Sequence, residues 1–323
     1  MQKESIFFRI VKKRIVMMIL LSVALFAFFA VMSNGISLKP KNLVNIVSAM
    51  SISAFLTTGI TMLMISGRLD LSTGANGTLC GMVLAFIMRA GMPLVPALLI
   101  ALGVGAFIGL INAFLVNELR IAPFIATLAT SSIATGCVYI LADKKIVEVT
   151  SPVLIGYGKH ILSNYIPVCS LIAFIFMIIA GVILHRTTFG RKIYMVGGNP
   201  QAAMLSGINP KKMSYTLFII CGIFAAMAGI TFVSRMQSAN LQGISAARFQ
   251  GITAAVLGGI AFGGGTGGMA GAFIGLLVLN TFSNGMNIIG ISPNWQNVAQ
   301  GLLLIFALTM DYFQKKSSLK SVA

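Results

Sequence analysis

Residues 94–117 read LVPALLIALGVGAFIGLINAFLVN, a nearly continuous apolar run that contains no charged side chain. An α-helix needs about 20 predominantly apolar residues to cross the hydrocarbon core of a bilayer. This run exceeds that length, and it lacks the polar stripe that a helix on the surface of a soluble protein would show. It therefore predicts a membrane-spanning helix.

The rest of the 323-residue chain has the same character, with 57% hydrophobic and only 9% charged residues. A soluble domain carries about 25% charged residues, so the charges here are too few to cover a soluble surface. Disordered chains are poor in apolar residues, which excludes disorder as well. We expect an all-α polytopic membrane protein with a single transmembrane domain over residues 1–323.

Further apolar runs of similar length follow one another along the whole chain, and they predict about ten transmembrane helices. The approximate spans are 15–33, 43–66, 71–90, 94–117, 121–142, 166–185, 213–234, 250–262, 270–289 and 295–312. The eighth span is short and rich in glycine, so we expect it to be broken or short. Ten crossings would place both chain ends on the same side of the membrane.

The net charge of +17 would suggest a nucleic-acid partner for a soluble protein. In a membrane protein, Lys and Arg collect instead in the cytoplasmic loops. With a cytoplasmic N-terminus, fifteen of the 23 Lys and Arg residues fall on the cytoplasmic side and eight on the other. We therefore expect both termini and the basic segment 186–212 in the cytoplasm, lipid around the helices, and no nucleic-acid partner.

The sequence offers no catalytic group, no metal site and no cofactor site. The four Cys residues lack ligand spacing, and His160 and His185 fall in different loops. The pattern G-x-G-x-x-G at 263–268 joins two membrane spans instead of a strand and a helix, which favours a tight turn over a dinucleotide site. Ion-coupled carriers usually keep ionisable groups within the membrane, and here such groups are almost absent. Energy for transport would then have to come from outside this chain.

Two glycine-containing connections resemble each other at an offset of 191 residues, although chance matches are easy among 34 glycines. One joins the second and third spans and the other joins the eighth and ninth, as in a parallel transporter repeat. Arg68 and Asp70 are two residues apart, so they cannot face each other on a helix, but they can hold a non-helical turn together. The residues that we expect in structural turns are Gly67, Asp70, Ser72, Gly258, Gly259 and Gly264.

Uncharged polar side chains recur at helical spacing in the last two spans. Asn280, Asn284 and Asn287 share one face of the ninth span, and Asn297 and Gln300 lie on the tenth. Such residues commonly form hydrogen bonds between packed helices. They can equally line a pathway for a neutral polar solute, and the sequence leaves both interpretations open. Ser and Thr residues on the second span allow the same two interpretations.

The long basic segment contains a strong local helix signal at residues 199–206. Asn199 is a favourable N-cap, Pro200 suits the first helical position, and Gly207 suits the residue after the last turn. The signal predicts a helix of about two turns, which can be an ordinary loop helix or a rigid element that contacts a partner.

The same segment, FGRKIYMVGGNPQAAMLSGI at 189–208, resembles the signature of the membrane subunits of ribose/galactose-type ABC importers. SGRLDLS at 66–72, APFIATL at 122–128, the stretch from Val256 to Gly271 and NGMN at 284–287 resemble further motifs of that family in the same order. The resemblance implies a permease in the bacterial inner membrane that pairs with a second copy or with a sister permease.

The resemblance also implies an ABC ATPase subunit that binds ATP and Mg²⁺, and an extracytoplasmic substrate-binding protein. It implies that the helix at 199–206 couples the permease to the ATPase. The coupling candidates are Gly197, Gly198, Asn199, Ala202, Ala203, Ser206 and Gly207. Family substrates are mainly pentoses, hexoses and related polar solutes.

The chain departs from the family pattern at Arg248–Thr253, where two acids are usual, and at Arg68, where glycine is usual. The resemblance therefore implies a monosaccharide or related polar solute without specifying which one. Two alternatives remain at this point: an ABC importer permease for nucleosides or another polar solute, and an ion-coupled secondary carrier.

Overall fold

Thirteen helices build almost the whole of the chain that the computed structural model describes, namely the backbone of residues 6–143, 145–162 and 166–320. The helices are α1 (Ile6–Met32), α2 (Pro40–Ile65), α3 (Thr73–Arg89), α4 (Leu94–Asn117), α5 (Pro123–Ala142), α6 (Pro152–Lys159), α7 (Val168–Arg186), α8 (Thr188–Gly198), α9 (Pro200–Leu205), α10 (Pro210–Met236), α11 (Arg248–Leu257), α12 (Met269–Ile288) and α13 (Pro293–Lys320). The all-α prediction is confirmed.

Extended structure within these residues is limited to two short antiparallel ladders. Strand β1 (Val147–Glu148) pairs with β4 (Ser238–Ala239), and β2 (Ile161–Leu162) pairs with β3 (Ile166–Pro167). Two single 3₁₀ turns, η1 (Ile36–Leu38) and η2 (Ser245–Ala247), precede α2 and α11.

Each of the ten predicted spans overlaps one of these helices, while α6, α8 and α9 lie in the connections. Six helices in the described part of the chain are long and apolar enough to cross a membrane: α2, α4, α5, α7, α10 and α12. The protein is therefore a multi-pass membrane protein. The count of ten crossings stays a prediction.

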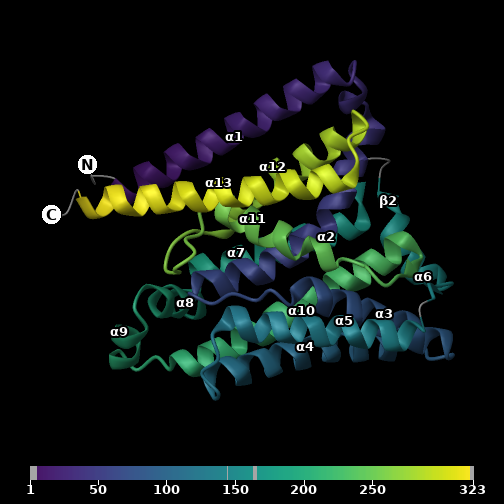
Figure 1. Cartoon of the computed structure of the whole chain (residues 1–323), viewed down its shortest axis with the longest axis horizontal. Coiled ribbons are helices and arrows are strands. Elements are labelled where there is room, and N and C mark those ends of the chain that lie inside the picture. Colours follow the sequence, from purple (N-terminus) through teal and green to yellow (C-terminus); the bar gives the residue numbers. More distant parts are fainter. Residues whose placement is uncertain (1–5, 144, 163–165, 321–323) are drawn as a thin grey trace.

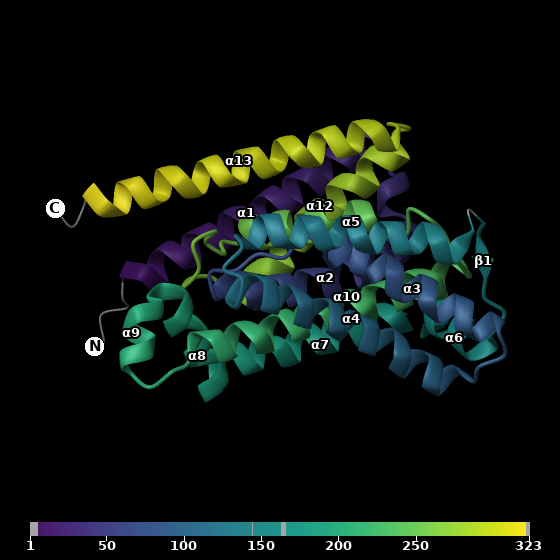
Figure 2. The ribbon, with the colours of Figure 1, turned by 60° about the horizontal axis from the view of Figure 1, so that its bottom comes forward.

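The helices run back and forth along the long axis of the molecule (Figures 1 and 2). The start of α1 and the end of α13 lie at the same end as α8 and α9, whereas α6 and the strands lie at the opposite end. We call these the α9 end and the α6 end. Residues 1–5 and 321–323, which we expect in the cytoplasm, lie outside the described residues.

Small residues allow α10 to approach its neighbours closely, which is the usual basis of helix packing in membranes. A Cβ on Gly109 or Gly222 of the α4–α10 contact would overlap backbone atoms of the opposite helix. The same is true of Gly229, which lies against the carbonyl group of Gly77 on α3. Helix α10 therefore forms the centre against which α3 and α4 pack.

The eighth predicted span is short and broken, as its glycine content indicated. Helix α11 has 10 residues and spans about 15 Å, half of a bilayer core. Before it, Ile244, the residue that precedes η2, lies against Thr78 of α3, whose hydroxyl accepts a 3.0 Å hydrogen bond from the Ile244 amide.

Candidate functional site

Helix α9 is a capped helix at the α9 end of the molecule (Figure 1). The side-chain oxygen of Asn199 accepts hydrogen bonds of 3.0 Å from the amides of Gln201 and Ala202. Pro200 occupies the first turn, and Gly207 follows the helix with a φ of +79°. The local prediction of a short capped helix is therefore confirmed.

The predicted coupling residues divide between the two faces of α9. Ala203 is buried, whereas Ala202 and Ser206 are exposed. Beside the exposed pair, Met204 is 61% and Leu205 89% exposed, and Leu205 is the most exposed large hydrophobic side chain that the structure describes. A protruding helix with an apolar tip has the form of a contact for another protein.

Three chain segments make close backbone contact at glycine residues where α8 approaches the end of α2. We call this contact of Gly197, Ile65, Gly67, Gly264 and Gly265 the glycine junction. The Gly265 amide donates a 2.8 Å hydrogen bond to the Ile65 carbonyl at the end of α2. A Cβ on Gly197 would overlap that carbonyl oxygen, and a Cβ on Gly264 would lie 2.6 Å from the Gly67 amide nitrogen. The junction therefore joins α8, α2 and the connection before α12 by backbone contact.

Tyr194 adds a side-chain link between α8 and the same connection. Its hydroxyl donates a 2.8 Å hydrogen bond to the Gly267 carbonyl, and its ring stacks on His185 of α7 at a centroid distance of 6.1 Å. Gly264, Gly265 and Gly267 all have positive φ, so the G-x-G-x-x-G segment is a tight turn in the structure.

The other residues expected in turns have different roles. Gly67 and Gly259 adopt positive φ and reverse the chain after α2 and α11. Gly258 instead ends α11 in a helical conformation, and a Cβ there would overlap the Gly271 carbonyl of α12. Gly258 therefore serves close helix packing.

Asp70 belongs to a buried hydrogen-bond network that fixes the connection between α2 and α3. Its Oδ1 accepts hydrogen bonds from the Ser72 amide at 2.7 Å and the Ser72 hydroxyl at 2.6 Å. Asn112 of α4 donates to the Ser72 hydroxyl at 2.9 Å and accepts from Thr130 of α5 at 2.7 Å. The Leu71 amide donates to Thr127 at 3.1 Å. Asp70 and Ser72 therefore lie in the turn as expected, and the carboxylate is satisfied by Ser72 and Asn112.

The polar face of α12 forms hydrogen bonds between helices. Asn284 exchanges two 3.1 Å hydrogen bonds with Asn42 of α2. On the adjoining α13, Gln296 donates to Asn287 at 2.6 Å and Gln300 donates to Ser283 at 3.2 Å. Asn280 donates to the carbonyl of its own helix at Leu276, and Asn297 is exposed. These contacts match the packing interpretation, and the pathway role of these residues stays a prediction.

A second polar set lies where α2 packs against α11, and sequence reasoning identified only its α2 members. The hydroxyls of Thr57 and Thr61 on α2 and of Thr253 on α11 are fully buried and have no hydrogen-bond partner among the described residues. Thr57 and Thr61 are four residues apart and share a helix face, which the sequence shows. That Thr253 belongs to the facing helix emerges only from the packing of α11 on α2.

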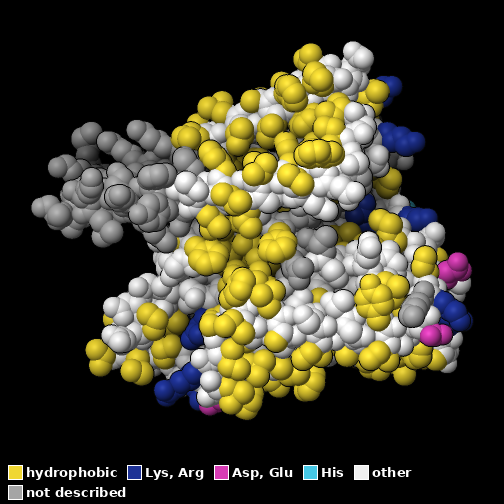
Figure 3. Space-filling view, in the orientation of Figure 1, with side chains coloured by type: hydrophobic (Ala, Val, Ile, Leu, Met, Phe, Trp, Pro, Cys, Tyr) yellow, Lys and Arg dark blue, Asp and Glu magenta, His cyan; other side chains and the backbone are white. Residues whose placement is uncertain are grey.

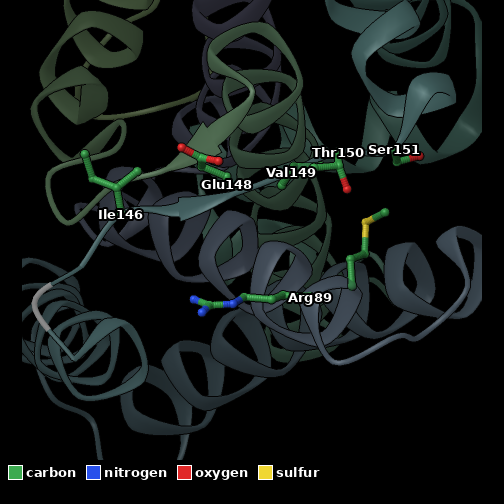
Figure 4. A pocket seen from close by; sticks show the side chains of 7 residues that line it. Arg89, Ile146, Glu148, Val149, Thr150 and Ser151 are labelled. Carbon is green, nitrogen blue, oxygen red and sulfur yellow. The ribbon is translucent and has the colours of Figure 1, made fainter.

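A polar cavity of about 550 Å³ opens at the α6 end (Figure 4). Arg89 from the end of α3 and Glu148 from β1 are among the residues that line it. Thr150 and Ser151 add polar groups to the wall. This end of the molecule therefore presents charges of both signs.

These features define a multi-pass helical membrane protein with a protruding capped helix rooted in its core. Residues 42–308 match the family described as branched-chain amino acid transport system / permease component, and the chain belongs to this family. Its members are permease subunits of ABC transporters and are not themselves enzymes.

Curated relatives match over most of their length. The ribose import permease protein RbsC of Bacillus subtilis is 32% identical over 87% of this chain and 87% of its own. The galactose/methyl galactoside import permease protein MglC of Escherichia coli is 30% identical over 94% of each chain. The L-arabinose transport system permease protein AraH of the same organism is 31% identical over 83% of this chain and 82% of its own. No solved structure matches the chain significantly.

Proposed function

We propose that this chain is the transmembrane permease subunit of an ATP-driven, binding-protein-dependent importer for a monosaccharide or a related polar solute. The relatives named for ribose, galactose and arabinose import support the substrate class. A separate ATPase that binds ATP and Mg²⁺ supplies the energy, since the chain contains no phosphate-binding loop of its own.

The observation that carries the proposal is the apolar tip of α9. Leu205 and Met204 lie on α9 and are exposed to solvent. The ATPase binds this tip, and its movement displaces α9 and α8 as one unit. The glycine junction passes that displacement directly to α2 and to the connection before α12, because backbone atoms touch there without intervening flexible side chains.

The proposed topology follows from the arrangement of the helices. The α9 end faces the cytoplasm and contains both chain ends, and ten crossings lie in a single transmembrane domain of the bacterial inner membrane. The substrate-binding protein docks at the α6 end, where the charged cavity of Figure 4 opens. A second copy or a sister permease completes a dimer around the pathway. The pathway candidates remain Asn280, Asn284, Asn287, Asn297 and Gln300.

Leu205→Asp tests the coupling assignment. The side chain contacts solvent, so the variant should insert in the membrane and keep its thermal midpoint within about 1 °C, as surface changes usually do. A desolvated charge at the centre of an interface is unfavourable, so ATPase association should weaken at least about tenfold. Solute uptake in cells and co-purification of the ATPase are the measurements.

Leu205→Met is the matched control, since it keeps an apolar side chain of similar volume and should support normal uptake. Normal uptake by Leu205→Asp would refute the coupling role of α9. Loss of membrane insertion in that variant would refute the assignment of Leu205 to an exposed tip.

Competing uptake assays distinguish the substrate classes. Cells that express the chain with its ATPase and binding protein should accumulate a labelled pentose or hexose and not a labelled nucleoside. Uptake by vesicles that contain this chain alone, driven by a proton or sodium gradient, would support an ion-coupled carrier and contradict the proposal.

A further inference from the structure

A second cavity, of about 660 Å³, lies at the α9 end between α9 and the ends of α2, α4 and α10. Three cations, Arg68, Arg120 and Lys211, line it, and we call it the basic cavity. Met204 and Gly207 form its wall on the α9 side. Neither the pathway candidates nor the glycine junction uses these cations.

Among the described residues, Lys211 is the one cation of the three whose side chain has a partner. Lys211 donates a 2.6 Å hydrogen bond to Glu118, and this contact together with Tyr215 holds the pKa of Glu118 below its usual range. Within the described part of the chain, the guanidinium groups of Arg68 and Arg120 form neither an ion pair nor a hydrogen bond. Arg68 is partly buried, and burial lowers its pKa, although an arginine stays charged in proteins. A desolvated cation without a partner is unfavourable, so the cavity is suited to an anion.

The surroundings of the cavity indicate which anion. Leu119 precedes Arg120 and is 55% exposed, and Phe114 and Phe124 are exposed on the adjoining turns of α4 and α5. Figure 3 shows Lys and Arg side chains at this end directly beside the hydrophobic surface of the lower edge, where α4 runs in Figure 1. A ligand that satisfies both features has an anionic head and an apolar body.

We propose that the basic cavity binds the phosphate headgroup of an anionic phospholipid, whose acyl chains lie on the exposed side chains of α4 and α5. Guanidinium groups match phosphate oxygens in geometry as well as charge. Basic pockets between helices on the cytoplasmic side are known to suit such headgroups. Because α9 forms one wall, the bound lipid contacts the helix that couples to the ATPase. The cytoplasmic location of the cavity and the effect of the lipid on coupling to the ATPase rest on the proposed function.

The test is a titration of the purified full chain, in a zwitterionic detergent, with dioctanoyl phosphatidylglycerol, followed by native mass spectrometry. Two cations near a headgroup each strengthen binding, so Arg120→Gln should weaken it about fivefold and Arg68→Gln with Arg120→Gln about thirtyfold. The control is the double variant Lys39→Gln with Lys41→Gln. It also removes two positive charges, but at the α6 end, and it should leave lipid binding unchanged. Arg120 is exposed, so its single variant keeps the test valid even if the double variant fails to fold.

Two further ligands distinguish binding of a phospholipid headgroup from binding of free phosphate. Dioctanoyl phosphatidylcholine should bind at least about fivefold more weakly, and inorganic phosphate should not compete at equal concentration. Competition by inorganic phosphate, or equal binding by the arginine variants, would overturn the proposal. So would loss of ATPase association in these variants with unchanged lipid binding, which would assign the cavity to an acidic side chain of the ATPase. The lipid titration itself needs neither solute nor ATPase, so its failure would leave the transport proposal standing.

Discussion

Gly197→Ala is expected to abolish uptake and to destabilise the protein by about 3 kcal/mol. The added Cβ would overlap the Ile65 carbonyl oxygen and lie 2.7 Å from the Gly265 amide nitrogen. Both neighbours are backbone atoms, and they are joined by the 2.8 Å hydrogen bond of the junction. Neither can rotate away as a side chain can, so α8 must separate from α2.

The neighbouring Gly198 provides the matched control. A Cβ on Gly198 meets no atom within 4 Å, and its φ is not positive, so alanine there should leave the thermal midpoint nearly unchanged. Thermal unfolding in detergent and uptake in cells measure the two variants side by side. Equal stability of both would show that the glycine junction is not a close backbone contact.

Asp70→Ala is expected to have the second-largest effect, a destabilisation of about 3 kcal/mol with loss of uptake. The substitution leaves the Ser72 amide without an acceptor in a fully buried site, and each such unsatisfied group costs about 1–3 kcal/mol. The network is shared with Asn112 and Thr130, so the loss extends to the contact of α3 with α4 and α5.

Asp70→Asn separates hydrogen bonding from charge. The amide oxygen can still accept the hydrogen bonds from Ser72, so most of the stability should return. Thermal midpoints of both variants, measured in the same detergent, provide the comparison. A loss in Asp70→Asn as large as in Asp70→Ala would mean that the negative charge, and not the hydrogen-bond network, fixes the connection between α2 and α3.

Much of the fold could be predicted because its signals are local. The length and apolar character of each run determine where a helix can lie in a membrane, and every predicted span contains a helix. The glycine content of residues 257–268 correctly indicated a break in the eighth span. The precise span count is harder to predict, because α11 has only 10 residues and the connection before α3 contains the buried residues Asp70, Leu71 and Ser72.

The candidate site could be predicted only in part. The cap of α9 was evident because Asn199, Pro200 and Gly207 act on neighbouring residues. The contact of Asp70 with Asn112 could not be predicted, since Asn112 is 42 residues away and no sequence pattern joins them. Similarly, Asn284 was identified as a polar helix position, but its pairing with Asn42 depends on how α12 packs on α2.

The sequence by itself determined that the protein is a bundle of membrane helices with one short capped helix in a basic connection. Those properties depend on the length of each apolar run and on interactions between side chains a few residues apart. Only the tertiary structure decided that Gly197 lies against Ile65 and Gly265, and that Arg68 and Arg120 share a cavity with α9. These contacts join residues far apart in the chain, and they depend on the packing of whole helices, which no local pattern records.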